Sequence, residues 1–174
     1  ESLEMRGPLG DVSIDMPEFE DFAKIGRGPN FKTNYKEMKY ISMIAGGTGI
    51  AGLMSILNHA DQLRYFEDYK VDLFFGVRKY EDFFFLNEIC KLSEKYNGNI
   101  KTYFITSDEE VSSKINSYDV HNGFVHEVFE DNLKSDYSER IAFLGGPSKM
   151  IDLVIPILLR SGISPDFVRF DKFG

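Results

Sequence analysis

The chain has 174 residues, enough for one domain with a real core at about 150 residues per domain, and this excludes a scaffold held together by disulfides. Its 20 Lys and Arg against 28 Asp and Glu give a net charge of −8, which disfavours a nucleic-acid partner. The single Cys90 fits a reducing compartment, and no apolar run reaches the about 18 residues that cross a bilayer. We therefore expect a cytoplasmic protein, with any membrane association left to segments outside this chain.

From residue 37 onward, short apolar runs alternate with stretches of helical spacing, which predicts a parallel sheet with crossover helices. Strands are predicted at 39–45, 71–77, 101–106, 140–145 and 167–170. Helices are predicted from Ile50, from near Glu81 and Asp82 to Asn97, from Val125 along a face reaching Leu133, and from Pro147 to Gly162. The stretch between the third strand and Gly123 is interpreted as a loop rich in Ser and Asp.

The predicted fold class is α/β, a doubly wound five-stranded parallel sheet of strand order 3-2-1-4-5 flanked by helices. Residues 1–36 do not follow this scheme, because Gly, Pro, Asp and Glu interrupt every apolar run there. We expect them to be a remnant or connector, and residues 37–174 to be the domain.

The strongest local motif is AGGTGIAG at residues 45–52, which follows the first strand and opens the first helix. An open α/β sheet binds its ligand at this edge. Glycines at 46, 47 and 49 remove the Cβ atoms that would keep a pyrophosphate or a flat ring from the backbone, and a helix N-terminus favours negative charge. The motif is neither a Walker loop nor G-x-G-x-x-G, so a tight strand-to-helix turn is the alternative interpretation.

A second glycine-rich turn, LGGPSKM at residues 144–150, follows the fourth strand. In a doubly wound sheet, strands 1 and 4 are neighbours at the point where the strand order reverses. Gly49 and Gly146 could therefore face a single ligand from two sides. The alternative is a helix start with Pro147 at its first position, which needs no amide proton.

A third motif, GVRKYED at residues 76–82, follows the second strand, where the adenosine end of a dinucleotide usually lies. A carboxylate there accepts hydrogen bonds from ribose hydroxyls and repels a 2′-phosphate, and Asp82 is the candidate. An acidic residue in the first turn of a helix is an equally good interpretation of Asp82. Arg78 or Lys79 could instead pair with a phosphate.

The remaining candidates are the C-terminal aromatics, the histidines and the cysteine. Phe170 and Phe173 in the tail PDFVRFDKFG are core residues or exposed ends, unless one of them stacks on a flavin. The three histidines show no metal-ligand spacing, so we expect no metal site. Cys90 falls mid-helix among apolar neighbours and is expected to be an inert core thiol.

Taken together, these motifs resemble the ferredoxin–NADP reductase superfamily, and within it the NADH-cytochrome b5 reductase and nitrate reductase flavoprotein group. The resemblance covers nearly the whole chain, with its motifs in the family's order. They are MRGPLG (5–10), MIAGGTGI (43–50), FGVRKYEDFFFLNEI (75–89), ITSD (105–108), GFVHEVF (123–129), GGPSKM (145–150) and the closing FDKFG.

The resemblance implies roles residue by residue. Gly47, Thr48 and Gly49 would meet the nicotinamide and pyrophosphate, with Thr48 close to the flavin. Asp82 and Asp108 would favour NADH, and Phe173, or else Phe170, would cover the flavin. The candidate cofactor-binding residues are Gly46, Gly47, Thr48, Gly49, Ile50, Arg78, Asp82, Ser107, Asp108, Gly146, Pro147, Met150 and Phe173, and the candidate catalytic positions are Thr48 and Gly145.

The resemblance also implies a function: the chain would be the nicotinamide-binding half of a flavoenzyme that passes a hydride from NADH to FAD and electrons on to a haem protein such as cytochrome b5. A β-barrel domain, of which residues 1–36 would be the end, would bind most of the FAD. Two departures matter, because Gly145 stands where the family has Cys and Gly52 where a proline usually follows. A non-catalytic nucleotide-binding regulatory domain is therefore one alternative, and a reductase component serving an oxygenase or quinone is another.

Overall fold

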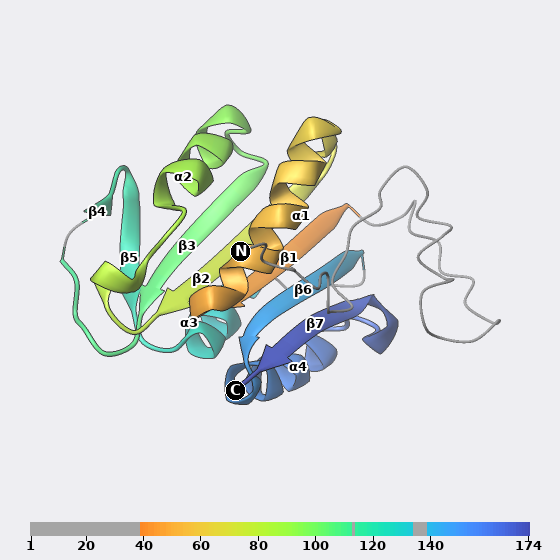
Figure 1. Ribbon diagram of the computed structural model, residues 1–174. Helices are drawn as coiled ribbons and strands as arrows, with labels where there is room; N and C mark the ends of the chain where they lie inside the picture. Colours follow the sequence, from red (N-terminus) through yellow and green to blue (C-terminus); the bar gives the residue numbers. More distant parts are fainter. Residues whose placement is uncertain (1–38, 113, 134–138) are drawn as a thin grey trace, which may run out of the picture.

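The computed structural model describes residues 39–112, 114–133 and 139–174, and the expected flavin-domain remnant at 1–36 lies outside them. The described residues form a seven-stranded sheet between helices (Figure 1). Its strands are β1 (Tyr40–Gly46), β2 (Lys70–Val77), β3 (Ile100–Thr106), β4 (Lys114–Ile115), β5 (Tyr118–Asn122), β6 (Arg140–Pro147) and β7 (Val168–Phe173). Its α-helices are α1 (Ile50–Gln62), α2 (Leu86–Lys95), α3 (Val125–Asp131) and α4 (Ser148–Arg160).

The strand order is β4-β5-β3-β2-β1-β6-β7. All neighbouring strands are parallel except β4 and β5. The five predicted strands are β1, β2, β3, β6 and β7, and the predicted order 3-2-1-4-5 is found among them. The α/β class is therefore confirmed, whereas the count of five is wrong because β4 and β5 extend the sheet beyond β3.

The two additional strands lie in the segment that was expected to be a loop. β5 has the sequence YDVHN, with no fully buried residue, and pairs with β3 through only three residues, at Val120, His121 and Asn122. It turns back from β4 through Asn116, whose φ of 52° is a conformation that asparagine tolerates. Such a short, half-exposed strand next to the sheet edge has no apolar alternation by which a sequence pattern could reveal it.

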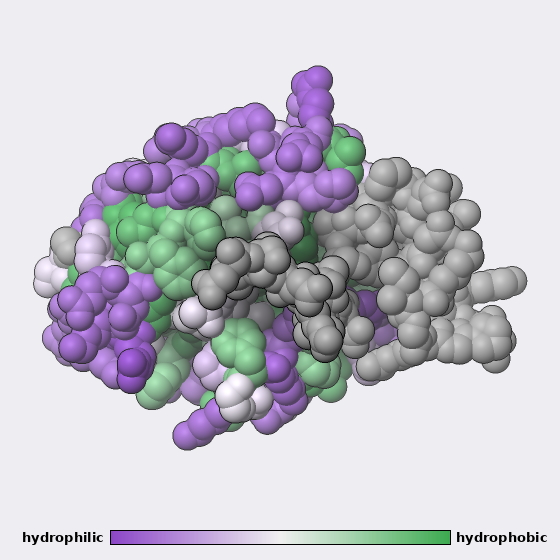
Figure 2. Space-filling model, in the orientation of Figure 1, coloured by the Kyte–Doolittle hydropathy of each residue, from purple (hydrophilic) through white to green (hydrophobic). Residues whose placement is uncertain are grey.

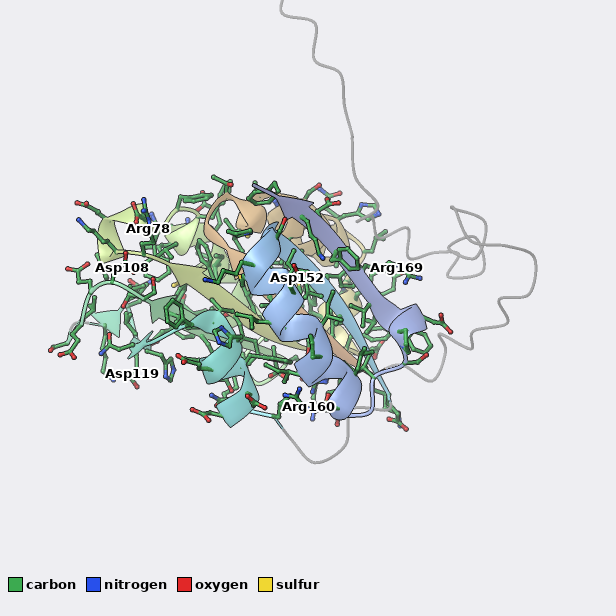
Figure 3. All side chains as sticks on the ribbon, turned by 90° about the horizontal axis from the view of Figure 1, so that it is seen from below. Arg78, Asp108, Asp119, Asp152, Arg160 and Arg169 are labelled. Atoms are coloured by element: carbon green, nitrogen blue, oxygen red, sulfur yellow. The ribbon has the colours of Figure 1, made fainter. Side chains whose placement is uncertain are left out.

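The helices cover both faces of the sheet. Figure 1 shows α1 and α2 on the near face and α3 and α4 behind, and Figure 3 shows the latter pair from below. Strands β1, β2, β3 and β6 are buried along nearly their whole length, which explains their continuous apolar sequences.

Helix α2 begins at Leu86, five residues after Glu81, so its predicted start is wrong. Residues Tyr80–Asp82 form a separate 3-10 turn, in which the Asp82 carboxylate accepts a hydrogen bond from the Lys79 amide at 3.1 Å. The next residues bury aromatic area instead of continuing the helix: the ring of Phe83 packs 5.2 Å from that of Phe75, between ring centroids. Figure 2 shows a hydrophobic area below α2, and Phe85, just before this helix, is 38% exposed.

Two other helix ends differ by a residue or two from the prediction. Helix α3 ends at Asp131, so Leu133 lies beyond it. Pro147 is the last residue of β6 and the N-cap of α4 rather than its first helical residue. Gly162 lies two residues after α4 with a φ of +98°, a left-handed conformation that suits a glycine at a helix end.

A buried ion pair joins three strands at their amino ends. The Arg140 guanidinium on β6 is 2% exposed and donates to the Asp72 carboxylate on β2 at 2.7 Å and to the Ser42 hydroxyl on β1 at 2.9 Å. Because these strands are parallel, the pair helps to align their opposite, carboxyl ends as well.

At the carboxyl ends, the turn after β1 and the end of β6 touch backbone to backbone. A Cβ atom added to Gly49 would lie 2.1 Å from the Gly145 carbonyl oxygen, and one added to Gly145 would lie 2.6 Å from the Gly49 carbonyl oxygen. Neither neighbour is a side-chain end that could rotate away, so this contact requires glycine on both sides.

We expect Gly49→Ala to lower the free energy of unfolding by about 1–3 kcal/mol, because the new methyl group must push two backbone segments apart. Gly52→Ala in the same helix is the matched control, since no atom lies within 4 Å of its added Cβ. The control should be neutral or stabilising by up to about 1 kcal/mol, owing to the higher helix propensity of alanine. Urea unfolding followed by circular dichroism measures both, and equal effects would contradict the contact.

Candidate functional site

A cleft of about 480 Å³ opens where the strands end, between the starts of α3 and α4. Strands β1, β2, β3, β5 and β6 all deliver their carboxyl ends to it. Its lining consists of Gly46, Gly76, Val77, Arg78, Ser107, Gly123, Phe124, Val125, His126, Glu127, Pro147, Lys149, Met150 and Leu153. This is the ligand position expected for an open parallel sheet, and its volume suits a ligand of nucleotide size.

Glycines let the walls of the cleft approach one another. A Cβ on Gly46 would lie 2.6 Å from the Met150 sulfur, and one on Gly146 would lie 2.8 Å from the Met150 methyl carbon. A Cβ on Gly76 would lie 1.9 Å from a methyl group of Val125, which lets α3 pack directly on β2. Met150 therefore lies across the ends of β1 and β6.

The structure brings the two glycine turns together, as their topology predicts. Gly49 and Gly145 are in contact, while Gly47 projects with a φ of +52° and no atom within 4 Å of an added Cβ. Thr48, beside it, is exposed. The backbone of Gly47 and Thr48 is therefore open to a ligand, whereas Gly49 is buried, and only Gly46 of this turn lines the cleft itself. Ile50, the first residue of α1, is fully buried.

The residues expected at the adenosine end fall into two groups. Arg78 and Ser107 line the cleft. Asp108 lines a neighbouring hollow of about 460 Å³ with Lys79, Tyr80, Glu81 and Glu109. The Asp108 amide donates to the Arg78 carbonyl at 2.9 Å, and its carboxylate accepts from the Ser107 hydroxyl at 2.7 Å. Figure 3 shows Arg78 and Asp108 at the same end of the sheet.

Asp82 lies apart from both groups. It lines neither the cleft nor the hollow, and its carboxylate caps the turn that precedes α2. Of the two carboxylates considered for ribose recognition, Asp108 is therefore the one that borders a hollow next to the cleft.

Phe173 stands beside the cleft rather than in it. It pairs with Pro147 in the register of β6 and β7, and its side chain is 41% exposed. The Ser148 hydroxyl donates to the Gly174 carbonyl at 3.2 Å, which ties the tail to the start of α4. The other tail aromatic, Phe170, lies three residues earlier on β7 with Lys172 over its ring.

The sequence analysis assigned no role to several residues that line the cleft, among them Phe124, His126 and Lys149. The Phe124 side chain is 56% exposed, and its ring stacks on His126 with 5.7 Å between centroids and 26° between planes. An exposed aromatic pair at the mouth of a cleft offers a flat surface to a planar ligand. The sequence signal for this pair is the aromatic residue directly after Gly123. It carried no weight because the preceding segment, which forms β5, was expected to be a loop.

The described part of the chain was also searched for a metal site, a reactive thiol and a membrane-spanning helix. No group of three or more His, Cys, Asp or Glu there could hold a metal ion. Burial raises the pKa of the Cys90 thiol, although Asn116 hydrogen-bonds to it, so the thiol is a poor nucleophile. Among the described helices, none is both long and apolar enough to span a bilayer.

Comparison with known proteins agrees with this geometry. Residues 43–155 match the family of oxidoreductase NAD-binding domains. The chain is 32% identical over 130 residues to the xylene/toluene monooxygenase electron transfer component XylA of Pseudomonas putida, covering 75% of this chain and 35% of that protein. It is 34% identical over 150 residues to sulfhydrogenase 2 subunit gamma of Pyrococcus furiosus, covering 80% of this chain and 50% of that protein. The chain thus spans half or less of the length of these relatives.

Solved structures share the fold. The cytochrome P450 reductase GcoB of Amycolatopsis superposes with a TM-score of 0.73 at 24% identity, over 96% of this chain and 42% of that one. The cytochrome b5 reductase domain of Ulva prolifera nitrate reductase gives 0.63 at 21% identity, over 77% and 49%. Since the family match spans more than half of the sequence, the chain belongs to the oxidoreductase NAD-binding domains, with the fold of the ferredoxin–NADP reductase class.

Proposed function

We propose that this chain is the NADH-binding half of an FAD-dependent oxidoreductase that passes a hydride from NADH to FAD and electrons on to a haem protein such as cytochrome b5. The observation that carries the proposal is the cleft, in which five strand ends, a glycine-rich floor and an exposed aromatic pair surround about 480 Å³. Family membership supports the choice of a nicotinamide dinucleotide as its ligand.

The strand order supports one direction for that ligand. The adenosine would lie at the ends of β3 and β5, with its base on the exposed ring of Phe124 and its ribose toward Ser107 and Asp108. The phosphates would pass Arg78 at the end of β2. The nicotinamide would then reach β1 and β6, the two strands whose glycine turns meet.

At the nicotinamide end, the candidate residues form a compact set. Gly47 and Thr48 present open backbone on one side, with Gly49 buried behind them, and Gly146, Pro147 and Met150 border the other. Gly145 leaves no thiol beside the ring, so orientation there depends on backbone groups and on the side chain of Met150.

FAD is held mainly by a separate N-terminal domain in this class of reductases, and when bound there it supplies a hydride acceptor that can release electrons one at a time. The contribution of this chain is to orient the nicotinamide and to exclude water. Thr48 and Phe173, both exposed near the end of β6 and the turn after β1, would face the flavin.

The electron acceptor has a second candidate. XylA is an electron transfer component of a monooxygenase, and another relative, from Psychrobacter cryohalolentis, is part of a Na(+)-translocating NADH-quinone reductase. These names favour a reductase component that serves an oxygenase or a quinone. The binding roles of this chain would be the same in either case.

When NADH is added anaerobically to the full-length protein that carries this chain, we expect the absorbance band of its oxidised FAD to bleach as soon as the two solutions are mixed. Dithionite is the control, since it reduces any competent flavin without using the cleft. A flavin that dithionite bleaches and NADH leaves oxidised for many minutes would support a regulatory domain without turnover, which Gly145 in place of a thiol also allows.

The acidic hollow predicts a preference for NADH. Asp108 and Glu109 would repel a 2′-phosphate, so calorimetry should show NAD+ binding at least about tenfold more tightly than NADP+. Asp108→Ser should reduce that ratio to about threefold or less. Asp68→Ser removes the same charge just before β2, at the opposite end of the sheet, and should leave the ratio unchanged; a matching drop in this control would argue against a local role for Asp108.

A further inference from the structure

The positive charge of Lys149 does not stabilise the fold through any contact among the described residues. It lies in the first turn of α4, a 13-residue helix whose first turn contains no acidic residue. The helix dipole makes this end positive, so a cation here is unfavourable for helix stability. Among the described residues, none forms an ion pair or hydrogen bond with the Lys149 side chain.

The lysines of the described chain fall into two groups. Four are paired with a carboxylate: Lys39 with Glu139, Lys95 with Asp61, Lys114 with Asp119 and Lys172 with Asp152. Within the same ranges, the others, Lys70, Lys79, Lys91, Lys101 and Lys149, have no ion-pair partner. What distinguishes Lys149 is its position, because its charge lies both at the positive end of a helix and on the wall of a cleft, which favours a ligand-based explanation.

The cleft supplies that explanation. Lys149 lines it together with Arg78, which follows β2 and likewise has no ion-pair partner within the described ranges. The one carboxylate among the described lining residues, Glu127, accepts a hydrogen bond from the Phe124 amide at 2.9 Å and so caps α3. Two cations from distant parts of the sequence thus face one cavity without an anion of their own.

We propose that Lys149 binds the diphosphate of the dinucleotide, acting across the cleft with Arg78; this inference rests on the proposed function. Lys149 lies between Pro147 and Met150 in sequence, hence near the nicotinamide end, while Arg78 lies toward Ser107 and the adenosine end. The diphosphate joins these two ends of the ligand. The planar Arg78 guanidinium suits two phosphate oxygens, and the Lys149 ammonium acts as a compact charge.

Isothermal titration of the 174-residue chain with NAD+, ADP-ribose and adenosine tests this role. Lys149→Met should weaken the binding of NAD+ and ADP-ribose by about tenfold and change that of adenosine by less than about twofold, because adenosine lacks the diphosphate. It should also flatten the dependence of the NAD+ dissociation constant on salt. Lys149→Arg should restore most of the affinity.

Lys91→Met is the matched control, because Lys91 is an exposed lysine on α2, which covers the opposite face of the sheet. It should leave all three affinities unchanged. If the unaltered chain binds NAD+ and Lys149→Met binds it equally well, the role of Lys149 is overturned while the proposed function stands. An equal loss for adenosine would also overturn it, as a general distortion of the cleft. If the unaltered chain binds neither NAD+ nor ADP-ribose, the proposed function fails and the role of Lys149 with it.

Discussion

The contact between Gly49 and Gly145 is the constraint on which the arrangement of the site depends. Strands β1 and β6 are parallel neighbours, so their following turns leave the sheet at the same edge, and the two glycines let these turns meet through backbone atoms alone. A side chain on either residue would separate the start of α1 from the end of β6. The open backbone at Gly47 and Thr48 and the wall formed by Pro147 and Met150 are therefore held in a common frame.

Much of this fold follows from hydrophobic pattern, because central parallel strands must be apolar along their whole length. The near-continuous apolar sequence of β2, KVDLFFGV, is typical of a central parallel strand that helices cover on both faces. The same reasoning misses β5, which lies next to the edge strand β4 and has half-exposed residues. It also misplaces the start of α2, because Asp82 caps a 3-10 turn and the ring of Phe83 packs on Phe75. Local acidic signals mark a turn but do not reveal which kind of turn it is.

The residues of the candidate site likewise fall into those that the sequence predicts and those that it does not. The glycine turns are contiguous motifs, and topology alone brings Gly49 and Gly145 to one edge. The position of Phe124 depends on β5, a strand with no sequence pattern, and the position of Lys149 depends on which side of α4 faces the cleft. The motif after the second strand makes Asp82 the ribose candidate, and the family resemblance adds Asp108, but only the structure shows that Asp82 is engaged in capping a turn. The strand order was therefore enough to predict that the two glycine turns meet, whereas the local turn geometry at Asp82 and the packing around Phe124 and Lys149 were not predictable from pattern.

The glycine at position 145 changes how a nicotinamide would have to be positioned. A thiol at this place would add a contact beside the reacting ring, but its Cβ would lie 2.6 Å from the Gly49 carbonyl oxygen. The backbone contact and the thiol therefore exclude one another in this geometry. Orientation must then come from the rest of the ligand, since a dinucleotide fixed at its base and at its phosphates leaves few rotations free at the nicotinamide. On this view the cations and the aromatic pair of the cleft provide the orientation that the missing side chain would have given locally.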